Sequence, residues 1–294
     1  MPGPAWHYRA EFWRLWVGLA RGLPRTVLEG LAPLAARIYW LAAPGRRRVV
    51  QENVLPALDG DAAAARRVAR ELFQQFALKL VDLWRYESGR PVDDLFHGPA
   101  DGWEHFEAAR ARGRGVLLVT VHLGNWEFGA PLLTRHGVKL LVVTAPEPHA
   151  RLTALRQAAR ARWGVETIAV GEHPFAGVEI LRRLEANDTV ALLVDRPPAV
   201  TAVMVDLFGR PFAASISAAE LARASGCAVL PVVLPRVDGG YRAHVLPEVA
   251  YDRRALGDRA ARIEFTRQIL HAFAPAVKTY LNQWYHFVPL WPAP

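Results

Sequence analysis

The sequence predicts an α/β fold in which a mixed central sheet is flanked by helices and preceded by an amphipathic helical platform. Three observations predict it. The chain has 294 residues and is 52% hydrophobic, so it can bury a large core. Short apolar segments alternate with helical patterns after Gly115, as in layered α/β proteins. Before residue 60, aromatic residues and arginines are interleaved on an apolar background.

These patterns predict a single domain over residues 1–294, with a helical region at 1–60 and an α/β core at 61–294. The segment 61–84 reads as a long helix with apolar residues at spacings of three and four, which is typical of core packing. The expected strands are 116–121, 139–144, 165–170, 189–194 and 228–234. The expected helices between them are 126–135, 151–163, 175–185 and 217–225.

The first 60 residues predict a helical region that lies in the lipid interface. Aromatic residues such as Trp13 and Trp40 suit the headgroup level, where arginine side chains can also reach water. The cluster Arg46, Arg47 and Arg48 would add about 1 kcal/mol per charge near anionic lipid. Packing of the same helices on the core is compatible with this interpretation. We expect neither a cleavable signal sequence nor a transmembrane span.

Charge and cysteine content narrow the partners and the compartment. The formal net charge of +8 favours anionic partners, such as a membrane surface, an acidic carrier protein or nucleic acid. The single cysteine, Cys227, excludes an intrachain disulfide and a cysteine-rich zinc module, and it fits a reducing compartment such as the cytoplasm. We interpret Cys227 as a small buried residue, and we expect neither a metal nor a cofactor.

The chemistry is best sought at the end of the strand 116–121, where His-Leu-Gly-Asn-Trp-Glu follows directly. On a continuous helix His122 and Glu127 would point about 140° apart, so they can meet only if His122 lies in the turn before the helix. Gly124 gives that turn its freedom. A carboxylate beside an imidazole fixes its tautomer and prepares the other nitrogen to take a proton. We therefore expect Glu127 to orient His122 as a general base.

The string from His122 to Glu127 resembles the signature of the late acyltransferases of lipid A biosynthesis, within the wider glycerolipid acyltransferase superfamily. The resemblance covers roughly residues 13–291 and rests on further blocks in the same order. These blocks are Arg160 and Arg162 before Gly164, Asp195-Arg196 after an apolar strand, Phe208-Gly209, and Leu221-Ala222 followed by Gly226 and Pro231.

The resemblance implies transfer of a fatty acyl group from an acyl carrier protein thioester, or acyl-CoA, to a hydroxyl of a membrane lipid. His122 would be the general base and Glu127 its partner. Backbone N–H groups near Asn125 and Trp126, or an arginine, would hold the oxyanion. The arginines Arg160, Arg162 and Arg196 would bind phosphate of the acceptor or of the carrier's pantetheine arm, and Asp195 would have a role in the site.

Two departures from the family pattern concern the acceptor. Pro197-Pro198 stiffens the loop after Arg196, and the C-terminal segment carries no arginine-rich ending. We expect the acceptor to be a lipid A precursor or a related glycolipid, with a phospholipid or an ornithine-type lipid as the alternatives. In the same segment we interpret His286 as part of a packed aromatic cluster.

Other functions stay open at this stage. No Gly-x-Ser-x-Gly elbow, zinc helix, dinucleotide loop or phosphate loop is present in the sequence. A lipid hydrolase or thioesterase could use the same two residues to activate water, and a basic membrane-binding or nucleic-acid-binding protein would use the arginines alone. We expect the acyltransferase, acting without nucleic acid at the cytoplasmic face of the bacterial inner membrane as a peripheral or monotopic protein.

Overall fold

A computed structural model describes residues 10–171 and 175–292 and has an α/β fold built on a mixed central sheet. The six strands of this sheet lie in the order β10-β7-β1-β4-β2-β3. Five of them are parallel, and β10 is antiparallel to β7, which makes the sheet mixed. Their bounds are β1 Val116–Thr120, β2 Leu140–Thr144, β3 Glu166–Ala169, β4 Thr189–Leu193, β7 Ala228–Val233 and β10 His244–Val245.

The five predicted strands are confirmed as β1, β2, β3, β4 and β7. All five residues of β1 are buried, because the parallel sheet is covered on both faces, and its first four residues are therefore a continuous apolar run. Successive side chains of β1 join different clusters: Leu117 and Val119 pack with one set of helices, and Val116 and Leu118 pack with another.

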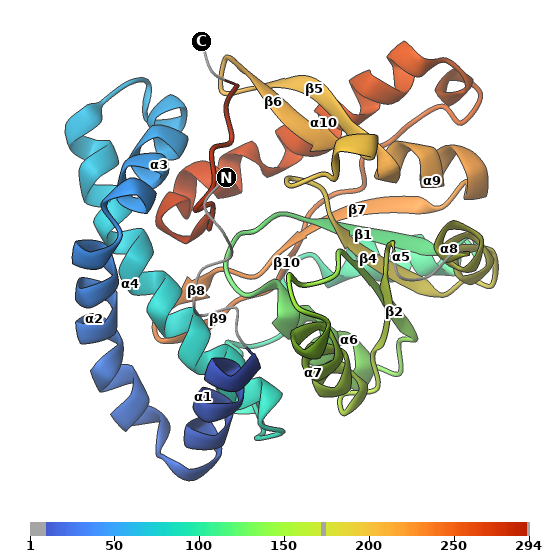
Figure 1. The fold of residues 1–294 in the computed structure, drawn as a ribbon. Helices are drawn as coiled ribbons and strands as arrows, with labels where there is room; N and C mark the ends of the chain where they lie inside the picture. The colour runs from blue at the N-terminus through green and yellow to red at the C-terminus, as the bar shows by residue number, and fades with distance from the viewer. Residues whose placement is uncertain (1–9, 172–174, 293–294) are drawn as a thin grey trace.

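Different helices cover the two faces of the sheet (Figure 1). The face of Leu117 packs against α8, α9 and α10, whereas the face of Leu118 packs against α5 and α6. The bounds of these helices, with α7, are α5 Trp103–Ala111, α6 Gly129–Arg135, α7 Ala150–Ala161, α8 Ala176–Glu185, α9 Ser217–Ser225 and α10 Arg259–Thr279. The predicted helices 126–135, 151–163, 175–185 and 217–225 are confirmed as α6 with its preceding 3-10 turn, α7, α8 and α9.

The predicted N-terminal helical region is also confirmed, and it lies to one side of the sheet (Figure 1). It consists of α1 Ala10–Gly22, α2 Arg25–Ala42 and α3 Pro44–Val54, which pack on the long helix α4 Ala62–Glu87. Asp61 caps α4 by accepting hydrogen bonds from the N–H groups of Ala63 and Ala64, both at 2.9 Å. Among the described residues, no helix has the length and apolar character required to cross a bilayer.

Helix α2 buries only one side. Leu28, Ala32 and Ala36 recur every four residues and are at most 3% exposed. The opposite side carries five exposed apolar side chains, which we call the α2 stripe. These are Val27, Leu31, Leu34, Ile38 and Leu41.

Several elements were not predicted. They are α5, α10, the short strands β8 Arg236–Val237 and β9 Gly240–Tyr241, the strand β10, and the hairpin of β5 Ala202–Leu207 with β6 Arg210–Ser215. The hairpin turns at Phe208 and Gly209, which both have positive φ (54° and 72°), as a two-residue type I′ turn requires. Phenylalanine is rare in that conformation, so the turn has no ordinary sequence signal.

Candidate active site

The site lies at the carboxyl ends of two adjacent parallel strands. In the register of β1 with β4, Thr120 is opposite Leu193, so the residues two positions further on, His122 and Asp195, come together. The Nδ1 atom of His122 lies 2.7 Å from Oδ1 of Asp195, and the backbone N–H of His122 donates to Oδ2 at 2.8 Å. The sheet register thus gives His122 a carboxylate partner 73 residues away in the chain.

Two side chains from the C-terminal segment complete the environment of Asp195. Trp284 donates its indole N–H to Oδ2 at 3.1 Å, and Nε2 of His286 lies 2.9 Å from the same oxygen. Asp195 is 1% exposed, and burial alone would raise its pKa. Electrostatic interactions and hydrogen bonds with His122 and His286 instead hold the pKa of Asp195 well below its usual range. Asp195 is therefore an ionised acceptor at neutral pH.

His122 is neutral in this environment. Burial lowers its pKa to about 4, with Arg196 and His286 acting in the same direction and Asp195 opposing them. Because a neutral imidazole that donates from Nδ1 keeps a lone pair on Nε2, His122 has an unprotonated nitrogen available. Its side chain is 16% exposed and lines a pocket.

The backbone around His122 is fixed by the turn that follows it. Gly124 has φ 64°, and a Cβ atom there would lie 1.9 Å from the carbonyl oxygen of Leu234. The N–H of Gly124 donates to the carbonyl of Gln283 at 3.0 Å, and the carbonyl of His122 accepts from Tyr285 at 2.7 Å. Only glycine fits this close approach of three chain segments.

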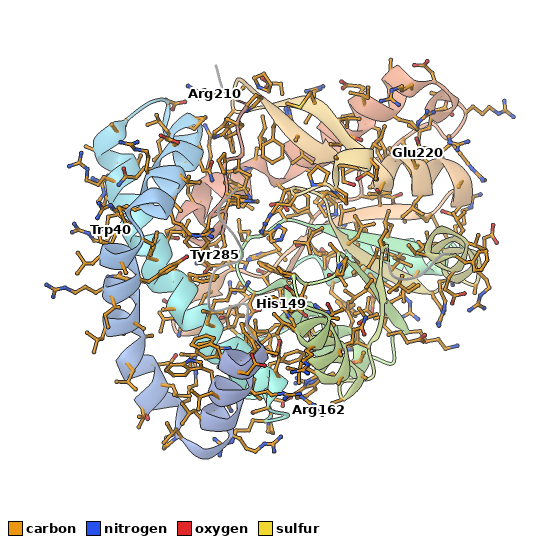
Figure 2. The ribbon with its side chains drawn as sticks, in the orientation of Figure 1. Trp40, His149, Arg162, Arg210, Glu220 and Tyr285 are labelled. Carbon is orange, nitrogen blue, oxygen red and sulfur yellow. The ribbon has the colours of Figure 1, made fainter. Side chains whose placement is uncertain are left out.

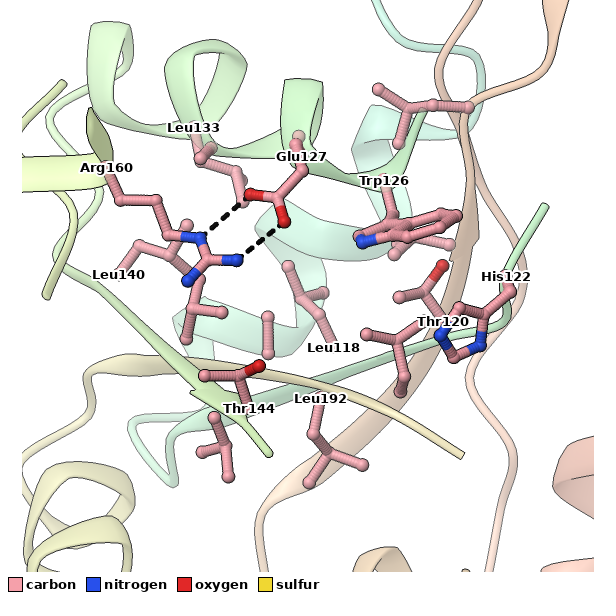
Figure 3. Close-up of a pocket in the computed structure, with 18 of the residues that line it drawn as sticks. Leu118, Thr120, His122, Trp126, Glu127, Leu133, Leu140, Thr144, Arg160 and Leu192 are labelled. Atoms are coloured by element: carbon pink, nitrogen blue, oxygen red, sulfur yellow. Dashed lines mark hydrogen bonds and ion pairs between the residues drawn. The ribbon is translucent and has the colours of Figure 1, made fainter. Parts of the chain in front are cut away.

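Glu127 does not partner His122, so that expectation is wrong. Its carboxylate forms a two-pronged ion pair with Arg160, at 2.8 and 2.6 Å, and accepts from Arg156 at 3.1 Å. Figure 3 shows this pair on one side of the pocket, with His122 on the other side beside Trp126. Burial alone would raise the pKa of Glu127, but Arg160 and Arg156 hold it at about 2. The carboxylate of Glu127 is paired with the two arginines, and Nδ1 of His122 is hydrogen-bonded to Asp195.

The pair of Glu127 and Arg160 belongs to a larger buried network of charges. Arg156 also donates to Glu147 at 2.7 Å and lies 3.4 Å from Glu87. Glu87 accepts a hydrogen bond from the indole N–H of Trp13 on α1. The network therefore joins the N-terminal helices, through α4 and α7, to the segment that follows His122.

Lys79 on α4 is a second buried cation near the site. Its Nζ lies 3.2 Å from the centroid of the Trp126 ring, and that ring packs edge-on against His122. Burial lowers the pKa of Lys79 well below its usual value, and Arg156 lowers it further. The Lys79 side chain supports the ring that forms one wall beside His122.

A pocket of about 150 Å³ opens beside His122, between the sheet and the helices α6 and α7 (Figure 3). Its floor is the face of the sheet that carries Leu118, and alternate residues of four neighbouring strands contribute to it. These are Leu118 and Thr120 of β1, Leu140, Val142 and Thr144 of β2, Ala191 and Leu193 of β4, and Val232 of β7; Val143 of β2 and Leu192 of β4 also line the pocket. Glu127, Glu147, Arg156 and Arg160 line the pocket beneath α6 and α7. The pocket thus joins a proton-accepting imidazole to a mainly apolar space.

The backbone N–H groups of Asn125 and Trp126, which were predicted to hold the oxyanion, differ in their availability. The backbone N–H of Asn125 donates to the carbonyl of Leu234 at 2.9 Å, so it is not free to hold an oxyanion. The Asn125 side chain is fully buried, and its amide has no partner within residues 10–171 and 175–292. Trp126 begins a 3-10 turn, where backbone N–H groups lack partners inside the turn, and it remains a candidate oxyanion donor.

The three predicted phosphate-binding arginines differ from one another. Arg160 forms an ion pair with Glu127, and Arg162 donates to the backbone carbonyl of Glu87. Neither guanidinium is therefore free for the phosphate binding that had been expected. Arg196 is exposed, and its charge reaches His122, where it lowers the pKa. Asp195, which was expected to have a role in the site, is 1% exposed and contacts His122 through both carboxylate oxygens.

The sequence reasoning missed four residues of this site. His286 is packed against Trp284, as expected of an aromatic cluster, but both also bind Asp195. Lys79 and Arg156 were treated as ordinary helix positions. The available signal was small: His286 is a titratable residue in an otherwise apolar C-terminal segment, and Lys79 is a cation in a helix whose neighbours indicate a core face.

His122, Asp195 and His286 could also hold a metal ion, because each offers one ligand atom and these atoms lie within 4.8 Å of one another. In the structure the same atoms are joined by hydrogen bonds from imidazole to carboxylate. This arrangement orients a histidine for proton transfer. The Nδ1 atom of His286 is buried without a partner in the described part of the chain.

His122 lines a mainly apolar pocket at the carboxyl edge of a mainly parallel sheet, which is where α/β proteins bind their ligands. The chain belongs to the bacterial lipid A biosynthesis acyltransferase family, which it matches over residues 5–292.

Curated relatives carry a related name. A phosphatidylinositol mannoside acyltransferase of Mycobacterium tuberculosis (strain CDC 1551 / Oshkosh) is 32% identical over 196 residues, which are 65% of this chain and 58% of that protein. The matched stretch thus spans less than two thirds of the length of that relative. A protein of the same name from Mycolicibacterium smegmatis is 26% identical over 297 residues, 96% of this chain and 90% of that protein.

Proposed function

We propose that the protein is an acyltransferase that moves a fatty acyl group from a thioester to a hydroxyl of a membrane lipid. The single observation that carries this proposal is the neutral His122, held by Asp195 at 2.7 Å and lining the apolar pocket. Family membership and the names of the curated relatives support the same reaction class.

In the proposed reaction, Nε2 of His122 takes the proton of the acceptor hydroxyl as its oxygen attacks the thioester carbonyl. The new C–O bond forms, the C–S bond breaks, and the proton on His122 passes to the leaving thiolate. Asp195 stabilises the imidazolium while it exists and keeps the Nδ1–H tautomer between turnovers. The acyl chain of the donor occupies the apolar part of the pocket.

The donor and acceptor are finer proposals. The net charge of +8 favours an acidic acyl carrier protein over acyl-CoA as the donor. For the acceptor, we propose a glycolipid with a sugar hydroxyl, because the family name refers to lipid A and the relatives' names refer to mannosylated phosphatidylinositol. Exposed Arg196 beside His122 is the cation best placed to meet a phosphate of either substrate.

The test is a transfer assay with acyl carrier protein and acyl-CoA thioesters, offered to lipid A precursors and to phosphatidylinositol mannosides. We expect an acylated lipid and free thiol in equal amounts, and a loss of at least about a hundredfold in the variant His122→Ala. The exposed His149→Ala variant, on the N-terminal side of α7, is the matched control. Fatty acid released at the same rate with and without any acceptor would identify a hydrolase instead.

We further propose that the N-terminal helices dock on an anionic membrane, at the cytoplasmic face of the bacterial inner membrane. The α2 stripe presents five apolar side chains that are 45–64% exposed, and Leu15 of α1 is 59% exposed. Exposed arginines on the same two helices, Arg14 and Arg37, add positive charge. An apolar face flanked by arginines suits insertion at the headgroup level.

Vesicle flotation tests this docking. The variant Leu34→Glu/Ile38→Glu should lose most of its binding to vesicles that contain anionic lipid, and wild-type binding should weaken as salt is raised. The control Met204→Glu/Val178→Glu changes two similarly exposed apolar residues on β5 and α8. Equal binding by both double variants would show that α2 does not carry the attachment.

A further inference from the structure

Trp284 and His286, which bind Asp195, lie in a C-terminal stretch that has little secondary structure of its own. We call residues 283–291 the C-terminal strap. The 3-10 turn Leu281–Gln283 leads into it, and within the described residues the rest of the strap forms no helix and only an isolated bridge at Trp284. The backbone groups of such a stretch need partners elsewhere in the protein. Whatever holds the strap therefore also holds the two side chains at Asp195.

Gln283 anchors the strap at its first residue. The Gln283 side chain is 4% exposed and forms two hydrogen bonds with the backbone of Arg236. Oε1 accepts from the N–H of Arg236 at 2.7 Å, and Nε2 donates to its carbonyl at 2.8 Å. The backbone carbonyl of Gln283 accepts from the N–H of Gly124 at 3.0 Å. One residue thus joins the strap to the start of β8 and to the turn that follows His122.

Asn53 of α3 anchors the rest of the strap. Its side chain is 3% exposed, and Nδ2 donates to the carbonyls of His286 at 3.0 Å and of Val288 at 2.8 Å. Oδ1 accepts from the N–H of Leu290 at 3.0 Å. The backbone carbonyl of Asn53 accepts from the indole N–H of Trp291 at 3.1 Å. Both polar atoms of this buried side chain are therefore bonded to the strap.

The strap sets the orientation of the Asp195 carboxylate. Oδ2 of Asp195 accepts from three donors, and two of them, the indole of Trp284 and the imidazole of His286, belong to the strap. Together the three donors keep Oδ1 aimed at Nδ1 of His122, 2.7 Å away. If the strap shifts, only the backbone N–H of His122 still fixes the carboxylate. The position of the strap thus controls the hydrogen bond that orients the proposed base.

We propose that Gln283 and Asn53 are positioning residues for the reaction. By fixing the strap, they keep the carboxylate of Asp195 aimed at His122. This inference rests on the proposed function. A misplacement of about 1 Å at a reacting group costs on the order of a hundredfold in rate. Neither Gln283 nor Asn53 lines the pocket at His122, so their loss should lower kcat and leave KM within about twofold of wild type.

The variant Gln283→Met removes both hydrogen bonds with Arg236 and keeps a side chain of similar length. We expect a loss in kcat on the order of a hundredfold. The control Gln74→Met makes the same change at an exposed position of α4. The variant Gln283→Glu can donate to the Arg236 carbonyl once its buried carboxyl is protonated, so at pH 5.5 its kcat should exceed that of Gln283→Met at least about tenfold. Equal kcat values for these two variants from pH 5 to 7 would show that the hydrogen bonds have no part in positioning.

The variant Asn53→Ala releases the strap from α3 and is independent of the first, so it also decides the question if Gln283→Met does not fold. Its control is Glu52→Ala, at the neighbouring exposed position of α3. We expect Asn53→Ala to lower kcat at least about tenfold with KM unchanged. A smaller loss in the folded variant, or a loss that lies in KM, would overturn the proposal.

Proton NMR of the His122 Nδ1–H, without substrate, separates this inference from the proposed function. The proton that His122 shares with Asp195 should resonate far downfield in wild type, and it should move upfield and exchange faster with water in Gln283→Met and Asn53→Ala. If His122→Ala keeps its transfer activity while this resonance changes in the strap variants, the reaction assignment is wrong and the positioning assignment stands. If transfer requires His122 but the resonance and kcat are unchanged in both variants, the positioning assignment is wrong.

Discussion

Replacing Asp195 with asparagine changes the polarity of one hydrogen bond at the centre of the site and keeps the side chain's shape. The carboxylate accepts four hydrogen bonds, one through Oδ1 from His122 and three through Oδ2. The asparagine amide can keep the three donors at Oδ2 only if its carbonyl oxygen takes the place of Oδ2. Its NH₂ group then faces Nδ1 of His122. That nitrogen must then become the acceptor, and the imidazole proton moves to Nε2.

The tautomer change removes the lone pair that we propose takes the substrate proton. Holding a general-base histidine in the wrong tautomer costs on the order of 10⁴-fold in kcat, with little effect on KM. Loss of one charge-assisted hydrogen bond costs about 1.5–3 kcal/mol in the free energy of unfolding. We therefore expect Asp195→Asn to be folded, less stable, and almost inactive.

The assay is acyl transfer at pH 7, with nitrogen NMR of the His122 imidazole and chemical denaturation on the same samples. The wild type should carry its proton on Nδ1, and Asp195→Asn should carry it on Nε2. The control is Asp206→Asn, at an exposed position of β5. If Asp195→Asn keeps kcat within tenfold of wild type while the NMR shows the changed tautomer, Asp195 does not act through His122.

Three further predictions concern the turn, the buried ion pair and pH. Gly124→Ala should unfold or inactivate the protein, because a Cβ atom there would lie 1.9 Å from a backbone oxygen. The control Gly137→Ala is also at positive φ but has nothing within 4 Å, so it should lower the free energy of unfolding by only about 1 kcal/mol. Thermal unfolding and activity are compared for the two variants. Glu127→Gln should lower the free energy of unfolding by about 3–5 kcal/mol, because it leaves buried arginines without their carboxylate; a loss below 1 kcal/mol in urea would contradict this. The pKa of His122 is about 4 in the folded protein and about 6.5 in an unfolded chain, so unfolding takes up a proton between these values. The stability of wild type relative to His122→Asn should therefore fall by about 3 kcal/mol as the pH decreases from 7 to 4, and denaturation curves that stay parallel over this range would refute the shift.

The sequence was sufficient to predict the helices and strands whose pattern lies within one short segment of the chain. Short, mainly apolar segments identified all five parallel strands, and the signal is strongest in central strands such as β1, which is buried on both faces. The spacing of apolar residues identified α4 to within three residues at its C-terminal end. The hairpin of β5 and β6 escaped, since Phe208 occupies a left-handed position that usually takes glycine or asparagine.

The sequence also located His122 correctly at the end of β1 but assigned it the wrong acid. Glu127 is five residues away and was chosen because it is near in the chain. The 3-10 turn at Trp126–Phe128 instead directs it to the arginines of α7, and those arginines can be recognised as its partners only when the helix is packed in place.

The amino-acid sequence by itself determined the layers of the fold, the family and the position of the central histidine, because each of these depends on residues that are neighbours in the chain or on one periodic pattern. Only the tertiary structure decided the partners. Asp195 reaches His122 through the register of two parallel strands, and His286 reaches Asp195 across 91 residues. Hydrogen bonds and ion pairs act over about 3 Å, so their pairing follows from the packed arrangement of the elements and leaves no pattern along the chain.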